Sequence, residues 1–334
     1  MYKINMNQII YVASPESQEI HVFHMNRQGM LILRQIVNAP GKGKPIVIHP
    51  ARTHLYLGIR PISSIVSYQI DKYGLLTEVA ITALPASPTQ LSIDCKGKML
   101  YSVSYNGSSL AVCPIDKKGI VHISRQTLKG LIHCHSANVD SKKKVVWVPC
   151  LTENRIRLYS INHSGFLAPY TPEALDSMAN TGPRHMVFHH TSNYAYVINE
   201  LSSTVNVIAI DSSPRIVQTV DIMPPTFQDV RCASDIHITP DCRWLYCGDR
   251  TASLISQFSV SKDGGMLQLV GHLSTETQPR GFNIDSQGKF LVVAGEKSNY
   301  IAVYSIDEIF GTLSLLARYP VGQGPMWVSI LMQH

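Results

Sequence analysis

The sequence repeats a pair of short apolar strands, most clearly at Arg184-His185-Met186-Val187-Phe188-His189 and Tyr194-Ala195-Tyr196-Val197-Ile198. Aromatic and β-branched residues fill both strands, and polar residues separate them, which is typical of an antiparallel hairpin. The first strand of the pair recurs at 45–50, 90–94, 135–140, 184–189, 235–240 and 280–285, and the second at 54–58, 99–103, 145–149, 194–198, 244–248 and 290–294. Third strands follow, as at 65–69 and 301–305, and a Gly turn leads to a fourth, as at 73–77.

The interval between copies is about 45 residues, which is typical of a propeller blade made of four antiparallel strands. Residues 9–13 match the second strand without a first strand before them, and residues 325–330 match a first strand without a second after them. Six complete units and one divided unit predict an all-β, seven-bladed β-propeller, a single domain over 1–334, with one blade closed by strands from both termini. The alternative is a pair of β-sandwiches, but a sandwich would not repeat one motif at one interval along the whole chain.

Composition excludes several classes of protein. Hydrophobic residues make up 45% and charged residues 16% of the chain, too apolar for disorder. The formal net charge of +6 is not gathered into basic clusters, and no apolar run reaches 18 residues, so we expect neither a nucleic-acid partner nor a membrane segment. Seven cysteines without CxxC spacing favour a reducing, cytoplasmic compartment. A closed ring needs no partner, and we expect a monomer.

Alignment of the repeats locates a candidate site at one mouth of the central channel. The start of the first strand and the end of the second meet at the same rim because these strands are antiparallel. The charged, histidine and tyrosine side chains at these two positions are Lys44, Arg60, Tyr105, His135, Arg184, Glu200, Arg250, Arg280 and Glu296. Charges that converge on a concave site are costly unless they bind a ligand or pair with each other.

Simpler interpretations exist for single members of this set. Arg184 and Glu200 could form a structural ion pair within one blade, and His135 could be a hydrogen-bonded channel histidine. The other histidines of the strands, among them His185 and His237, stand at alternating positions, and we interpret them as structural. The chain has no metal-binding HExxH spacing, no GxSxG and no P-loop motif, so we expect no metal and no cofactor.

Several long blocks resemble the propeller-type bacterial 6-phosphogluconolactonases, a lactonase group related to fungal carboxymuconate cyclase. The blocks are Ala13-Ser14-Pro15-Glu16-Ser17, Cys134-His135-Ser136-Ala137-Asn138, Gly182-Pro183-Arg184-His185-Met186, Asn199-Glu200-Leu201, Asp249-Arg250-Thr251-Ala252-Ser253, Gln278-Pro279-Arg280-Gly281-Phe282 and Gly322-Gln323-Gly324-Pro325-Met326-Trp327. The resemblance covers nearly the whole chain from residue 9. It implies hydrolysis of a phosphorylated sugar lactone, 6-phospho-D-glucono-1,5-lactone, without a cofactor.

The resemblance also implies site residues. The His, Arg and Glu of the related cyclase fall on His135, Arg184 and Glu200, and its second Arg falls on Arg280 or Arg250. Lactone hydrolysis needs a base for water and a stabiliser for the oxyanion. We assign the base to His135 or Glu200, and oxyanion or phosphate contacts to Arg184 and Arg280.

The remaining rim residues, Lys44, Arg60, Tyr105, Arg250 and Glu296, are expected to bind substrate. Two other functions use the same sequence features. One is a cycloisomerase acting on a muconate-like acid, because a dicarboxylate also needs arginines. The other is a propeller without enzymatic activity that presents a surface to a protein.

Overall fold

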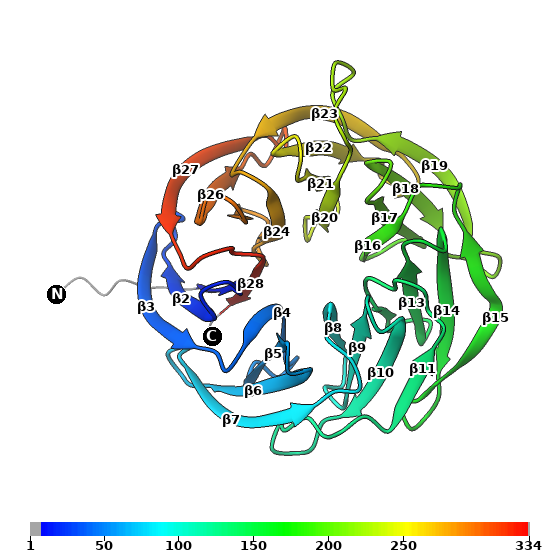
Figure 1. Cartoon of the computed structure of the whole chain (residues 1–334). Coiled ribbons are helices and arrows are strands. Elements are labelled where there is room, and N and C mark those ends of the chain that lie inside the picture. Colours follow the sequence, from blue (N-terminus) through cyan, green and yellow to red (C-terminus); the bar gives the residue numbers. More distant parts are fainter. Residues whose placement is uncertain (1–7, 333–334) are drawn as a thin grey trace.

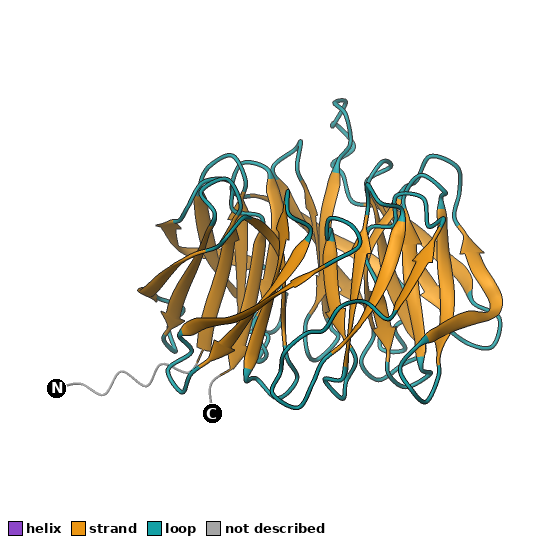
Figure 2. Ribbon diagram, turned by 60° about the horizontal axis from the view of Figure 1, so that its bottom comes forward, coloured by secondary structure: helices purple, strands orange, loops and turns teal. Residues whose placement is uncertain are grey.

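The computed structural model describes residues 8–332, and this part of the chain contains strands and turns but no helix. It therefore contains no helix that could cross a membrane. Seven four-stranded antiparallel sheets stand as blades around a central channel (Figure 1). Seen from the side, the strands cross the thickness of a disc, and loops cover its two faces (Figure 2).

The blades are numbered here by the chain order of their innermost strands, and strands are given from the channel outward. Blades 1 and 2 contain β4 (Lys42–Ile48), β5 (His54–Arg60), β6 (Ser64–Ile70) and β7 (Leu76–Ala83), then β8 (Gln90–Ile93), β9 (Met99–Ser104), β10 (Ser109–Pro114) and β11 (Gln126–Lys129). Blades 3 and 4 contain β12 (Asn138–Asp140), β13 (Val145–Cys150), β14 (Arg155–Ile161) and β15 (Leu167–Asp176), then β16 (Pro183–Phe188), β17 (Tyr194–Asn199), β18 (Thr204–Ala209) and β19 (Arg215–Asp221). Blades 5 and 6 contain β20 (Ala233–Ile238), β21 (Trp244–Asp249), β22 (Leu254–Val260) and β23 (Leu267–Ser274), then β24 (Pro279–Ile284), β25 (Phe290–Gly295), β26 (Tyr300–Ile306) and β27 (Leu313–Pro320).

Blade 7 joins the two ends of the described chain. Its innermost strand is β28 (Trp327–Met332), followed outward by β1 (Gln8–Ser14), β2 (Glu19–Met25) and β3 (Leu31–Asn38). The pairing of β28 with β1 sets Ile10 opposite Ile330. The predicted seven-bladed propeller with a divided blade is thus confirmed, and the sandwich alternative is wrong. Residues 1–7 and 333–334 of the expected domain lie outside the described residues.

The hydrophobic core lies between the blades. Each second strand is almost entirely buried, as in β13 and β25. The buried apolar side chains form seven clusters, each shared by two neighbouring blades. Every blade is covered on both faces by its neighbours. The apolar side chains on the two faces of a sheet are therefore all buried only when the ring is closed.

A tyrosine at the same place in five second strands fastens each of those blades to the next. Its hydroxyl donates to the carbonyl of a Gly in the turn between the third and fourth strands of the following blade. The pairs are Tyr11–Gly74, Tyr56–Gly119, Tyr101–Gly165, Tyr196–Gly264 and Tyr246–Gly311. All five glycines have a φ between +65° and +86°, a conformation that favours Gly. Trp147 and Val292 hold this place in blades 3 and 6.

We expect Tyr246→Phe to lower the free energy of unfolding by about 1–2 kcal/mol, because a buried carbonyl loses its donor while the ring stays. The bond from Tyr246 Oη to Gly311 O is 2.7 Å long and buried. Urea denaturation of the variant and the parent measures the change. Tyr73→Phe is the control, since the Tyr73 side chain is exposed. Equal effects of the two variants would contradict a role for the hydroxyl in joining the blades.

Candidate active site

Breaks in strand register place several predicted site residues at the rim. In β16, Pro183 pairs with Asn199 and His185 pairs with Ile198, so that Arg184 is the extra residue of a bulge. In β24, Arg280 has the same position between Pro279 and Gly281. The first strands of blades 1 and 5 break register at Gly43–Ile46 and Ala233–Ile236. A bulge turns its extra side chain out of the regular alternation, and here it directs Lys44, Arg184 and Arg280 to one mouth of the channel.

Arg184, Glu200 and Arg250 form one ion-paired group across blades 4 and 5. Arg184 Nε donates to Glu200 Oε2 at 2.7 Å, and Arg250 Nη2 lies 3.0 Å from Glu200 Oε1. Arg184 Nη1 also donates to the carbonyl of Ser234. The Arg184 side chain is only 2% exposed, and that of Glu200 is 19% exposed. The Arg184–Glu200 ion pair, raised above as the simpler structural interpretation, is therefore present, and Arg250 shares the carboxylate.

Electrostatic interactions within this group keep Glu200 and Arg184 ionised. Burial alone would raise the pKa of Glu200, but Arg184 and Arg250 outweigh it and keep that pKa below its usual value. Burial lowers the pKa of Arg184 to about 10, with Glu200 acting in the opposite direction. Both groups are charged at neutral pH, so the Glu200 carboxylate is a poor base.

The cations on the other side of the mouth are less fully paired. Arg280 Nη1 lies 3.1 Å from Glu296 Oε2, but Arg280 Nε is buried without a hydrogen-bond partner. Burial, with the charges of Arg280, Arg184, Arg60 and Arg250, puts the pKa of Lys44 well below its usual value. Burial and the charge of Arg280 also lower the pKa of Arg60. The rim has four guanidinium groups and only two carboxylates, those of Glu200 and Glu296. Positive charge is therefore in excess at the mouth and would attract an anion.

His135 lies within this positive surface. It follows the isolated bridge between Cys134 and Cys150, three residues before β12 begins. The ring of Tyr105 meets it edge-on at 5.9 Å between centroids, and His135 Nδ1 is buried without a hydrogen-bond partner. Burial, followed by Arg184, His185, Lys44 and Arg280, sets its pKa well below the ordinary value. His135 is therefore neutral at pH 7, the form that can accept a proton.

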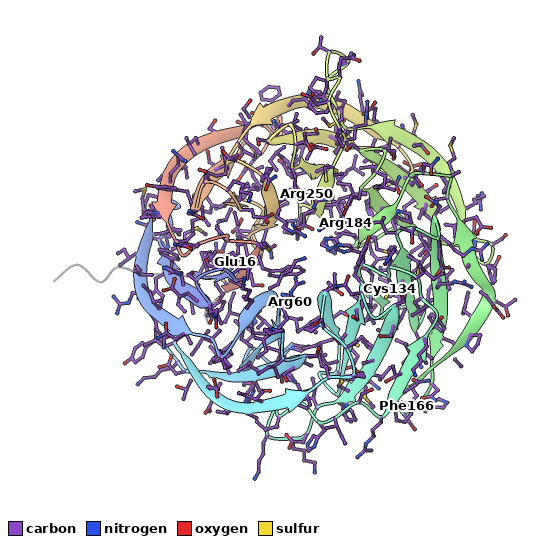
Figure 3. All side chains as sticks on the ribbon, viewed as in Figure 1. Glu16, Arg60, Cys134, Phe166, Arg184 and Arg250 are labelled. Atoms are coloured by element: carbon purple, nitrogen blue, oxygen red, sulfur yellow. The ribbon has the colours of Figure 1, made fainter. Side chains whose placement is uncertain are left out.

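The structure brings the nine residues expected at the rim to the same channel mouth. Figure 3 shows Arg60, Arg184 and Arg250 around the central opening, with Glu16 beside them. The structure adds residues that the alignment of repeats did not select. Glu16 pairs with Lys42 at 2.5 Å, and His133 stacks on Tyr105 at 4.3 Å between centroids. These lie in loops or at irregular positions, where the repeat gives no signal.

Beneath the rim, the channel has a volume of about 450 Å³. Its lining begins one residue below the rim, at Ser136 and His185, and includes Asp235 and His237. His185, interpreted from the sequence as structural, lies with its ring centroid 5.0 Å from that of His135. The position of His185 directly after the rim residue Arg184 was visible in the sequence. Its contact with His135 of the neighbouring blade was not visible.

Among residues 8–332, no group of three or more His, Cys, Asp or Glu side chains is placed to hold a metal ion. The seven cysteines are free thiols. Besides Lys44 and Tyr105, the nine rim residues supply the neutral imidazole of His135, four guanidinium groups and two carboxylates. This combination can bind an anion, accept a proton and stabilise negative charge on oxygen.

Comparison with known proteins places the whole fold in one family. Residues 9–330 match the family model described as lactonase, seven-bladed β-propeller. A 6-phosphogluconolactonase of Sodalis glossinidius is 67% identical over 98% of this chain and 99% of its own, and one of Serratia proteamaculans is 52% identical over the same shares. A solved periplasmic gluconolactonase of Pseudomonas aeruginosa has a TM-score of 0.90 at 23% identity over 98% of this chain and 99% of its own, a likeness of fold alone. The chain belongs to the family of seven-bladed β-propeller lactonases.

Proposed function

We propose that the protein hydrolyses 6-phospho-D-glucono-1,5-lactone to 6-phospho-D-gluconate, the second step of the oxidative pentose phosphate pathway. The lactonase class follows from the family, and the curated relatives carry the name 6-phosphogluconolactonase. One observation carries the choice of a phosphorylated substrate. Two buried polar atoms at the mouth, His135 Nδ1 and Arg280 Nε, lack partners in a surface of excess positive charge. A buried polar atom without a partner costs about 1–3 kcal/mol. The four guanidinium groups of the rim face only two rim carboxylates, and this balance of charge favours an anionic ligand.

In the proposed reaction, His135 takes a proton from water while the water oxygen bonds to the lactone carbonyl carbon. Glu200 is less suited to this role because two guanidinium groups bind its carboxylate. Arg184 and Arg250, fixed by Glu200, face the negative charge that develops on the carbonyl oxygen. The tetrahedral intermediate then breaks its bond to the ring oxygen, which receives the proton from His135. The carboxylic acid so formed ionises, and one proton leaves per turnover.

The 6-phosphate is assigned to the less fully paired side of the mouth, where Arg60 and Arg280 lie. Arginine suits this contact because its planar fork matches two phosphate oxygens. Lys44 adds a donor between this side and the Arg184 group.

We expect the purified protein to accelerate the loss of freshly made 6-phosphogluconolactone over spontaneous hydrolysis. We also expect kcat/KM for glucono-1,5-lactone, which lacks the phosphate, to be lower by about 10²-fold, because two charge-assisted hydrogen bonds are lost. A stopped-flow record of proton release measures both reactions.

Arg280→Ala is the matched variant for this comparison. It should raise KM for the phosphorylated lactone and leave the slow reaction of glucono-1,5-lactone nearly unchanged. No acceleration of either lactone would refute the proposal and direct attention to a muconate-like acid. Equal kcat/KM for the two lactones would contradict the proposed phosphate site but not the proposed lactone hydrolysis.

A further inference from the structure

A buried carboxylate lies beneath the rim and takes no part in the reaction proposed above. Asp235 belongs to β20, at the register break, and its side chain is 13% exposed. Its Oδ1 lies 2.7 Å from Nδ1 of His185, and its Oδ2 lies 3.2 Å from Nε2 of His237. Two backbone N–H groups, of Ile236 and Phe282, also donate to it at 3.1 and 3.3 Å. Both carboxylate oxygens are therefore occupied, each by one imidazole and one amide.

These contacts fix the proton on the His185 ring. A carboxylate can only accept, so the nitrogen that faces it, Nδ1, carries the hydrogen. Arg184 Nη1, which can only donate, lies 3.3 Å from each ring nitrogen. A second proton on Nε2 would set an imidazolium against a guanidinium. The environment selects the neutral ring with the proton on Nδ1.

His185 in turn packs against His135. Their ring centroids are 5.0 Å apart with an interplanar angle of 64°, and Trp327 meets the His185 ring on another side at 6.1 Å. His135 Nδ1 has no hydrogen bond that would orient its ring. The orientation of His135 therefore depends on packing, and His185 supplies a large part of it together with Tyr105.

We propose that Asp235 is a positioning residue of the lactonase site: it fixes the tautomer and orientation of His185, and His185 holds the ring of His135 in place for proton transfer. Asp235 lines the channel beneath the rim, and protein donors occupy both of its carboxylate oxygens, so we assign it no direct contact with the substrate. The kinetic part of this inference rests on the proposed function.

The charges around His185 agree with this role. Burial, with the charge of Arg184, lowers the pKa of His185 to about 4, and Asp235 acts in the opposite direction. Burial alone would raise the pKa of Asp235, but His237 and His185 outweigh it and hold that pKa far below its usual range. The other groups that face His185 are Lys44, from β4, and the neutral ring of His135. Asp235 is thus an anion beside the neutral ring of His185, and it partly offsets the charge of Arg184.

Asp235→Asn tests the proposal with little change of shape. An amide can accept from one imidazole only while its N–H₂ faces the other, so one of the two rings must change its tautomer or turn away. We expect kcat for the phosphorylated lactone to fall by about 10- to 100-fold with KM changed by less than about threefold, since small misplacements of a reacting group have effects of this size. Asp285→Asn is the control, because Asp285 is also a buried carboxylate, more fully buried than Asp235, but it accepts from Gln8 Nε2, Lys289 N and Phe290 N and not from a histidine.

A second readout needs no substrate. Nitrogen-15 NMR of the histidine rings should show His185 in the wild-type protein with its proton on Nδ1 and neutral down to about pH 5. The spectrum should change in Asp235→Asn and stay unchanged in Asp285→Asn. A wild-type His185 with its proton on Nε2 would overturn the proposal, as would an Asp235→Asn variant whose kcat equals that of Asp285→Asn. If Asp235→Asn does not fold, His185→Gln replaces it in the kinetic comparison. An inactive wild-type protein would refute the proposed function alone, since the NMR result still decides the tautomer.

Discussion

Replacement of His135 by Gln is expected to lower kcat for the phosphorylated lactone by about 10²- to 10⁴-fold, the usual contribution of a general base. KM should change little, because we assign the phosphate to arginines on the other side of the mouth. Gln keeps a polar side chain of similar length that can contact water but cannot accept its proton. Steady-state kinetics with the freshly made lactone measures the loss.

The pH profile checks the same assignment. Burial and the cations Arg184, Lys44 and Arg280 put the pKa of His135 well below its ordinary value. A lowered pKa means that the neutral, basic form persists as the pH falls. The rate should therefore stay constant from neutral pH to below 6.5 and decline only at more acid pH.

His133→Gln is the control for His135→Gln. His133 lies at the same mouth and stacks on Tyr105, but its Nδ1 is already bonded to Thr152 Oγ1 at 2.8 Å. It should keep most of the parent kcat. If His135→Gln kept its kcat as well, the base would have to be another group, and Glu200 would be the next to test.

Arg184→Met is expected to have the largest effect on stability, about 3–5 kcal/mol, because it leaves the mostly buried Glu200 with one partner in place of two. The Ser234 carbonyl loses its donor in the same change. Activity should fall by at least about 10²-fold, since one donor to the oxyanion is removed and Arg250 is no longer fixed from both sides of Glu200. Urea denaturation and kinetics on the folded variant separate the two losses.

Arg215→Met provides the comparison for Arg184→Met. Arg215 pairs with Asp211 at the start of β19, and both side chains are well exposed. An exposed pair contributes at most about 1 kcal/mol, so stability and kcat should stay near those of the parent. A similar loss of stability and kcat in both variants would contradict a specific role for the contacts of Arg184 with Glu200 and Ser234.

The fold could be predicted from the sequence because its signal is periodic. Every blade repeats the same two apolar strands, and the orphan strands at 9–13 and 325–330 identify the divided blade. The tyrosine at the third place of five second strands was also visible, but its partner was not. The Gly that accepts from Tyr246 lies 65 residues further on, in the next blade, and no pattern within one repeat connects them.

The site was predictable where it follows the repeat. The positions of Arg184 and Glu200 in aligned strands placed both at one rim and allowed an ion pair between them, and the structure shows that pair. The bulge that turns Arg184 and Arg280 into the channel was not visible, because a bulge depends on the pairing of both strands. Nor was Asp235, whose importance comes from contacts with His185 of another blade. Contacts between blades are set by how the ring closes, and a one-dimensional alignment does not contain them.

The divided blade has a consequence for how the protein is made. Blade 7 needs β28 beside β1, so the ring stays open until β28 has been synthesised. Blades 1 to 6 and strands β1, β2 and β3 can form earlier, but the core cluster shared by blades 6 and 7 lacks Val328 until β28 is in place. A nascent chain that stops before β28 therefore lacks Trp327 against His185 and carries exposed core surface. Proteases and chaperones recognise such surface, so a chain that lacks β28 is a target for removal.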